Sequence, residues 1–280
     1  MARVIAVANQ KGGVGKTTTA INLAASFAAA EVDTLLIDCD PQSNASSGLG
    51  LGKDPQRLST YELITGTAQV EQIALATDLE KLHVIPSSKN LIGANIELVS
   101  AENREFKLRK ALETVRSRFE FIVLDCPPAL DLLTLNALVA ADAVVIPMQA
   151  EYFALEGVSE LLDTIERIRE TFNPSLGVDG VVLTMYDDRT NLAQAVAGEL
   201  KNYFGDRLCS ATIPRNVRLA EAPSHGKPAL LYDPKSRGAE SYIKLAKEIM
   251  DRASSTSAVA PEELAAKLAP STETTANADD

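Results

Sequence analysis

Residues 9–19, NQKGGVGKTTT, have the types and spacing of a loop that binds the phosphates of a nucleotide. Glycines allow the backbone to wrap closely around phosphate groups, so that its N–H groups and the start of the next helix face them. Lys16 adds a positive charge for the terminal phosphates, and the Thr17 hydroxyl is a ligand type for Mg²⁺. A glycine-rich turn that merely caps a helix is the alternative. We predict a nucleoside-triphosphate site formed by Lys11, Gly12, Gly13, Val14, Gly15, Lys16, Thr17 and Thr18.

Two features of this loop depart from the pattern G-x-x-x-x-G-K-[ST]. Gln10 stands where the first glycine belongs, and Lys11 adds a second lysine five residues before Lys16. The second lysine therefore needs an explanation of its own.

Three aspartates follow predicted strands and are expected to reach the loop. In LLIDCDPQ, the alternation of a strand places Asp38 and Asp40 on one face, and in FIVLDCPP, Asp125 ends an apolar strand. Ligands of open α/β sheets bind at the carboxyl ends of strands, so we expect the three acids to converge near Thr17. Either Asp38 or Asp40 alone could instead cap the turn before Pro41. The convergence of all three with the loop favours a metal–phosphate site.

The rest of the chain alternates short apolar runs with amphipathic segments. Near-continuous Val, Ile and Leu are typical of parallel strands that are covered on both faces. The pattern predicts an α/β fold: a doubly wound, mostly parallel, Rossmann-like sheet with helices on both faces, as in P-loop nucleotide-binding proteins. The predicted strands are 3–9, 34–40, 82–87, 121–127, 143–149 and 180–186, and the predicted helices lie near 17–30, 102–118, 156–171, 191–203 and 238–252.

Domain organisation follows from the same pattern. Residues 1–252 are predicted to form one domain, in which residues 41–77 have the weakest periodicity and should form short helices and loops. Residues 253–280 are rich in Ala, Ser and Thr and contain five acidic residues and one lysine, so a flexible acidic tail is expected.

Composition limits the classes of function. The 280 residues carry a net charge of −11, so any binding to a polyanion must depend on a local basic patch. No secretory signal and no apolar run of the ~18 residues needed for a membrane helix are evident. The cysteines Cys39, Cys126 and Cys209 are scattered without the spacing of a zinc site or a disulfide framework. We therefore expect a protein of the reducing cytoplasm.

The stretches KGGVGKTT, DCDPQ and IVLDCPP closely resemble those of the deviant Walker-A ATPases of the ParA/MinD class. Four further stretches narrow the resemblance to the ParA/Soj type of DNA-partition ATPase, over about residues 2–250. These are EYFALEG (151–157), TMYDDRTNLA (184–193), IPRNVRLAEAPSHGKP (213–228) and YDPKSRGAESY (232–242). The resemblance implies a weak intrinsic ATPase activity with ATP and Mg²⁺ as cofactors.

The resemblance also implies roles for the site residues. Lys11 matches the lysine that reaches across a homodimer to the ATP of the other subunit, which would explain the second lysine of the loop. Asp40 matches the catalytic aspartate that orients the attacking water. Thr17, Asp38 and Asp125 would hold or support Mg²⁺, and Lys16 would bind phosphate. The adenine end would be formed by Met185, Pro214, Arg215 and Asn216.

A second activity implied by the resemblance is ATP-dependent, non-specific DNA binding by the dimer on the nucleoid. Residues 215–237 carry five basic residues against Glu221 and Asp233, a local positive excess. The candidate DNA-binding residues are Arg189 and Arg218, with Lys201, Arg207 and Lys235 as further candidates. The implied partner is a centromere-binding protein of the ParB type that stimulates hydrolysis, and the implied function is segregation of chromosome or plasmid DNA.

Two alternatives use the same nucleotide site. A MinD-like or cargo-positioning ATPase would use the same ATP dimer on a different surface. The acidic tail lacks the basic and bulky apolar faces of a membrane-surface helix, so no membrane contact is expected. The other alternative is a metabolic P-loop enzyme, which would give Lys11 no evident role.

Overall fold

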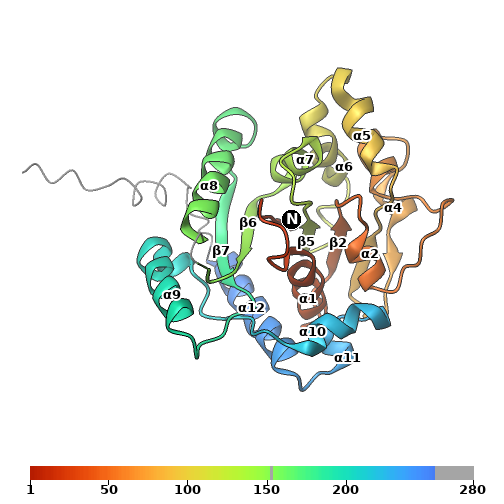
Figure 1. Ribbon diagram of the computed structural model, residues 1–280. Helices are drawn as coiled ribbons and strands as arrows, with labels where there is room; N and C mark the ends of the chain where they lie inside the picture. The colour runs from red at the N-terminus through yellow and green to blue at the C-terminus, as the bar shows by residue number, and fades with distance from the viewer. Residues whose placement is uncertain (152–153, 256–280) are drawn as a thin grey trace, which may run out of the picture.

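The computed structural model describes residues 1–151 and 154–255. Of the predicted tail, only residues 253–255 belong to this part, so the prediction for residues 256–280 lies outside the described residues. The same holds for residues 152–153 of the EYFALEG stretch. The described chain forms one layered α/β unit (Figure 1).

A seven-stranded sheet in the order β3-β4-β2-β5-β1-β6-β7 lies at its centre. All neighbouring strands are parallel except β3, which runs antiparallel to β4 at one edge. The predicted mostly parallel sheet is therefore confirmed. The strands are β1 (Arg3–Val7), β2 (Thr34–Asp38), β3 (Leu75–Ala76), β4 (Leu82–Ile85), β5 (Phe121–Asp125), β6 (Ala143–Met148) and β7 (Gly177–Leu183).

Helices cover both faces of this sheet, as Figure 1 shows. None in the described part of the chain is both long enough and apolar enough to cross a membrane. The α-helices are α1 (Lys16–Ala29), α2 (Asn44–Gly48), α3 (Thr60–Thr65), α4 (Val70–Ile73), α5 (Leu91–Glu97), α6 (Lys107–Glu113), α7 (Leu132–Ala140), α8 (Ala154–Thr171), α9 (Asn191–Phe204), α10 (Val217–Glu221), α11 (Ala229–Tyr232) and α12 (Arg237–Ser254). The 3₁₀ turns are η1 (Leu98–Ser100), η2 (Arg104–Phe106), η3 (Gly205–Arg207) and η4 (Ala222–His225).

The strand alternation divides the core into two apolar layers. In β1, Val4 and Ala6 pack with residues of α6, α7, α8 and α9, whereas Ile5 and Val7 pack with α1 and α12 on the other face. All four side chains are fully buried. A strand that is buried on both faces reads as a continuous apolar run, which is why the sequence revealed it.

The register of the central strands aligns their carboxyl ends. Val7 of β1 pairs with Asp125 of β5, and Asp38 of β2 pairs with the same Asp125. The loop that follows β1 leads directly into α1 at Lys16. The sheet therefore brings both aspartates to the edge at which the glycine-rich loop begins.

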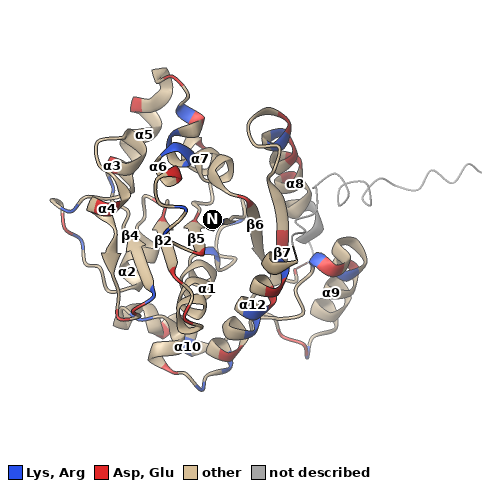
Figure 2. Cartoon of the chain, turned by 180° about the vertical axis from the view of Figure 1, so that it is seen from behind, with Lys and Arg blue, Asp and Glu red and all other residues tan. Residues whose placement is uncertain are grey.

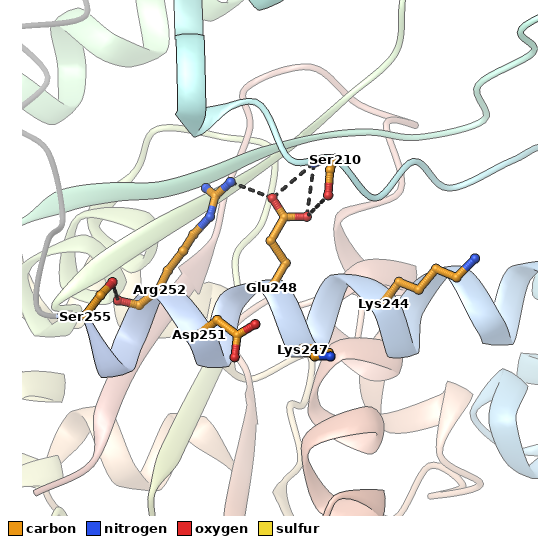
Figure 3. Close-up of a pocket in the computed structure, with 7 residues that line it drawn as sticks. All are labelled: Ser210, Lys244, Lys247, Glu248, Asp251, Arg252 and Ser255. Atoms are coloured by element: carbon orange, nitrogen blue, oxygen red, sulfur yellow. Dashed lines mark hydrogen bonds and ion pairs between the residues drawn. The ribbon is translucent and has the colours of Figure 1, made fainter.

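Glu248 fixes helix α12 to the segment that follows η3, as Figure 3 shows for Ser210. Its carboxylate accepts hydrogen bonds from the N–H groups of Ser210 (3.0 Å) and Ala211 (3.2 Å) and from Arg252 at 2.6 Å. Burial alone would raise the pKa of Glu248, but these donors hold it below its usual value. The carboxylate thus joins the last described helix to the loop before α10.

The structure differs from the predicted elements in several places. Helices α5, α10 and α11 were not predicted, and β7 begins and ends three residues before the predicted strand 180–186. The predicted helix at 102–118 is divided into η2 and α6, and β3 was not predicted. Helix α7 was also missed, because LLTLNALVA is apolar on nearly all sides and shows no amphipathic period. The weakly periodic segment 41–77 does contain the expected short helices α2, α3 and α4.

One prediction concerns the packing of α12 on α10. A Cβ at Gly238 would lie 2.6 Å from Cγ of Leu219, closer than van der Waals contact allows. Gly238→Ala should therefore lower the free energy of unfolding by about 1–3 kcal/mol. The matched control is Gly198→Ala in α9, where no atom beyond the adjoining backbone of the helix lies within 4 Å of the added carbon. Because alanine favours a helix, this change should raise the same quantity by about 0.5–1 kcal/mol. Urea unfolding would measure both, and equal effects would contradict the packing argument.

Candidate active site

The glycine-rich loop has the backbone shape that wraps around an anion. Gly13 and Gly15 have φ angles of 75° and 86°, in the left-handed region that glycine adopts most readily. The Thr184 hydroxyl donates to the carbonyl of Val14 at 2.7 Å, and the Gln149 amide donates to the carbonyl of Gly13 at 3.1 Å. Neighbouring strands therefore hold the loop in this conformation.

Lys16 lies at the centre of the site. It is only 7% exposed, and its ammonium donates to the carbonyl of Lys11 at 2.9 Å. Burial lowers the pKa of Lys16, while the nearby Asp125, Cys126 and Asp40 act in the opposite direction. A cation in a partly desolvated loop is attracted strongly to an anionic ligand.

Asp125 is a buried carboxylate without a hydrogen-bond partner. Neither of its oxygens is exposed, and neither makes a hydrogen bond of normal geometry. Burial, followed by the charge of Asp38, raises the pKa of Asp125 well above its usual value, and the nearby Thr17 hydroxyl opposes this only partly. An orphaned carboxylate of this kind is suited to a cation.

Asp38 is equally buried but is well satisfied. One oxygen accepts from the backbone N–H of Ser46 at 2.8 Å and from its hydroxyl at 2.6 Å, and the other accepts from the N–H of Asp40 at 3.1 Å. Burial still raises the pKa of Asp38 to about 6, because these bonds offset only part of the desolvation. Asp38 therefore supports the loop after β2 as well as the charge of the site.

The donor set fits magnesium bound together with a nucleotide. The described residues contain no group of three or more His, Cys, Asp or Glu side chains able to hold a metal by themselves. Mg²⁺ usually takes one or two carboxylates and completes its shell with phosphate oxygens and water. This requirement is matched by Asp125 and the Thr17 hydroxyl, with Asp38 as further support. The oxygens of Asp125 that lack a hydrogen bond are the atoms available to a cation.

Asp40 lies in the loop that follows β2 and is 7% exposed. Its Oδ1 accepts from the N–H of Gln42 at 2.9 Å, and its carbonyl accepts from the N–H of Ser43 at 2.8 Å. Ser43 has a φ of 57°, unusual for a residue other than glycine. The tight turn holds Asp40 near Lys16 and Asp125, so the predicted convergence of the three acids is present.

Lys11 is directed away from the central cation. Its ammonium forms an ion pair with Glu151, and about half of each side chain is exposed. The Lys11 N–H donates to Oδ1 of Asn9 at 2.9 Å, and the Asn9 amide donates to the carbonyl of Pro147 at 2.8 Å. The backbone at Lys11 is therefore fixed, while its side chain reaches the surface. No pattern in the sequence indicates Glu151 as its partner.

A cavity of about 260 Å³ adjoins the loop at Gly15 and Thr18. It contains all four residues predicted for the adenine end. Five others were missed, because β7, α10 and α12 meet there only after folding. The predicted residues are Met185, Pro214, Arg215 and Asn216, and the missed ones are Thr184, Ile213, Leu219, Ala220 and Tyr242.

The predicted DNA-binding residues lie in two groups. Arg189 precedes α9, Lys201 is on α9 and Arg207 is in η3, whereas Arg218 is on α10 and Lys235 precedes α12.

Arg189 and Arg218 are exposed and paired with acids of their own chain. Arg189 donates to Asp187 at 2.6 Å and 2.8 Å, and Arg218 donates to Glu221 at 2.8 Å. Arg207 is partly buried, and burial together with Arg252 lowers its pKa. Basic residues are interspersed with acidic ones along α9 and α12 (Figure 2). Arg207 is thus less accessible than the other candidates.

The chain is similar to known proteins over most of its length. A family described as an AAA domain matches residues 2–178. The chain is 53% identical over 249 residues to the sporulation initiation inhibitor protein Soj of Bacillus subtilis, covering 89% of this chain and 98% of the relative. It is 51% identical over 250 residues to the chromosome partitioning protein ParA of Myxococcus xanthus, covering 89% of this chain and 88% of the relative.

The fold also matches a solved structure of cobyrinic acid a,c-diamide synthase from Mycobacterium smegmatis with a bound ATP analog and magnesium. The TM-score is 0.79 at 33% identity, covering 92% of this chain and 98% of that one. The partition proteins are more similar in sequence over nearly the same length. The chain belongs to the ParA/Soj family of chromosome-partitioning ATPases.

Proposed function

We propose that this protein is an ATP-dependent dimerising switch that binds DNA without sequence preference and takes part in segregating chromosome or plasmid DNA. The observation that carries the proposal is that Lys16 and the carboxylate of Asp125, which makes no hydrogen bond of normal geometry, lie close enough to influence each other's pKa at a loop shaped for phosphate. Its named relatives support the cellular role.

The residues of the loop would bind and position ATP. Backbone N–H groups and Lys16 would hold the phosphates, while Thr17, Asp125 and Asp38 would hold or support Mg²⁺, which neutralises phosphate charge when bound. Asp40 would orient the attacking water by hydrogen bonding, since phosphoryl transfer depends mainly on positioning and charge stabilisation. The cavity lined by Met185 would receive adenine.

Lys11 would leave its own chain's Glu151 to bind the phosphates of ATP in a second subunit. Exposed ion pairs contribute only about 0–1 kcal/mol, so little free energy opposes the exchange. A lysine supplied in this way would also reduce the repulsion between two triphosphates that face each other. ATP would thereby favour the dimer, and hydrolysis would release it.

Dimerisation would place two copies of each basic group on one assembly. Because the chain is strongly acidic, a single copy should bind DNA weakly, and two copies would gain phosphate contacts together. A partner of the ParB type would stimulate hydrolysis and so release the protein from DNA. The ATP-bound form would then stay on the nucleoid only until its ATP is hydrolysed.

Replacing Lys11 should separate nucleotide binding from dimerisation. Lys11→Ala should bind ATP within about threefold of the unchanged protein, because Lys16 remains, but should not form the ATP-dependent dimer. Sedimentation velocity with ATP and Mg²⁺ would measure the dimer, and a fluorescent ATP analogue would measure binding. Lys244→Ala, an exposed lysine on α12, is the matched control. An intact dimer in Lys11→Ala would contradict the proposed exchange.

Replacing Asp125 should stabilise the nucleotide-free protein while weakening its use of magnesium. Asp125→Asn replaces a carboxyl group whose ionised form is disfavoured by burial and by Asp38, so the variant no longer has to neutralise this group on folding. Each unit of raised pKa corresponds to about 1.4 kcal/mol. We expect a higher melting temperature without nucleotide, and loss of the additional increase that Mg²⁺ gives with ATP. Calorimetry under both conditions would test this. A lower melting temperature without nucleotide would show that Asp125 serves the fold instead.

DNA binding should be tested in a variant that retains ATP. With Asp40→Ala, binding to a non-specific duplex should require ATP and should weaken steeply with salt. Adding Arg218→Glu should weaken it by about tenfold or more, since each subunit loses a phosphate contact and gains a repulsion. Arg118→Glu, which breaks an exposed ion pair with Glu71 on α4, is the control. An ATP-dependent dimer that does not bind DNA would indicate that the protein acts through another surface, and binding to lipid vesicles would then be measured.

A further inference from the structure

A second cavity, larger than the one next to the glycine-rich loop, lies on the β4 side of the sheet. Its volume is about 670 Å³, within the 300–1,000 Å³ typical of small-molecule sites. The turn after β2, the loop between α2 and α3, and the segment after β4 form its walls. These elements lie toward the β4 end of the sheet, whereas α8 and α9 lie toward the β7 end (Figure 1).

The cavity is positively charged, although the protein is acidic. Lys53, Arg57 and Lys89 line it against a single acid, Asp54. Within the described chain, neither lysine forms an ion pair or a side-chain hydrogen bond. Arg57 donates to the carbonyl of Gly52 at 2.9 Å and approaches Asp54 only at 3.9 Å. Most of the positive charge of the cavity therefore remains available to a ligand.

A separate observation also indicates a polar ligand. Ser87 lines the cavity, and its hydroxyl oxygen is buried without a hydrogen-bond partner. The N–H of the same residue donates to the Ser46 hydroxyl at 2.9 Å, and that hydroxyl donates to Asp38. The cavity wall is thus attached through Ser46 to Asp38 at the end of β2, yet the Ser87 hydroxyl has no hydrogen-bond partner.

We propose that this cavity binds a phosphorylated small molecule of nucleotide size, at a site separate from the glycine-rich loop. Ammonium and guanidinium groups form their strongest hydrogen bonds with phosphate, and serine hydroxyls add donors. Leu51, Leu58 and Ile92 give the same cavity an apolar side suited to a ring. The combination of unpaired cations, hydroxyl donors and apolar surface selects an anion attached to an apolar body.

The position of the cavity gives this ligand a route to the catalytic residue. Pro41 and Gln42 form part of the wall, and the Gln42 N–H holds Oδ1 of Asp40. A ligand that contacts this turn would change the position of Asp40. This regulatory consequence rests on the proposed ATPase function, whereas binding itself does not.

Titration calorimetry on the full chain would test the site. The glycine-rich loop is first saturated with Mg-ADP, and the protein is then titrated with inorganic pyrophosphate and, separately, with guanosine monophosphate, which lacks a β-phosphate for that loop. We expect at least one probe to bind at about one per chain. Lys53→Gln combined with Lys89→Gln should weaken this binding at least tenfold, with an unchanged melting temperature and unchanged Mg-ADP binding.

The matched control carries Lys244→Gln and Lys247→Gln, two exposed lysines beside the shallow groove of α12 (Figure 3). It should bind the probes as the unchanged protein does. Absence of binding by both probes at 1 mM, or equal binding by the double variant of the cavity, would overturn the proposal. Failure of Mg-ADP to bind in the first step would instead contradict the proposed function.

Discussion

Two buried carboxylates at paired positions of neighbouring strands form the constraint around which this protein is organised. Asp38 and Asp125 face each other in the register of β2 and β5, fully withdrawn from solvent. Such an arrangement is unfavourable for charged groups unless cations and hydrogen bonds compensate it. Lys16, Ser46 and the backbone after β2 supply part of this compensation. The oxygens of Asp125 that remain without a hydrogen bond are the groups to which we propose that a metal–nucleotide complex binds.

The parts of the site that could be predicted were the contiguous strand–loop–helix unit and the aspartates at the carboxyl ends of two further strands. The glycines, Lys16 and Thr17 are nearly contiguous in sequence. Asp38 and Asp125 directly follow apolar runs, and the carboxyl ends of parallel strands meet at one edge of a sheet. The adenine-side cavity was predicted only in part. Tyr242 reaches the cavity from α12, and Thr184 reaches it from the position directly after β7. Their proximity depends on the packing of the whole domain.

Other features could not be read from local patterns. The partner of Lys11 lies 140 positions away in sequence, and a surface lysine has no preference that identifies a particular acid. Helix α7 has no polar face from which a period could be recognised. The DNA-binding residues remain predictions, because exposed arginines with nearby acids suit either an ion pair or a ligand.

The strand order also governs how the chain can fold as it is synthesised. β1 is made first, but its two neighbours in the sheet are β5 and β6, which end only at Asp125 and Met148. Until the ribosome has released this length, an apolar strand and the glycine-rich loop behind it have no sheet to join. Pairings so distant in sequence form slowly and leave apolar surface exposed in the meantime. The nucleotide loop, although encoded near the N-terminus, is therefore among the later parts of the molecule to acquire its shape.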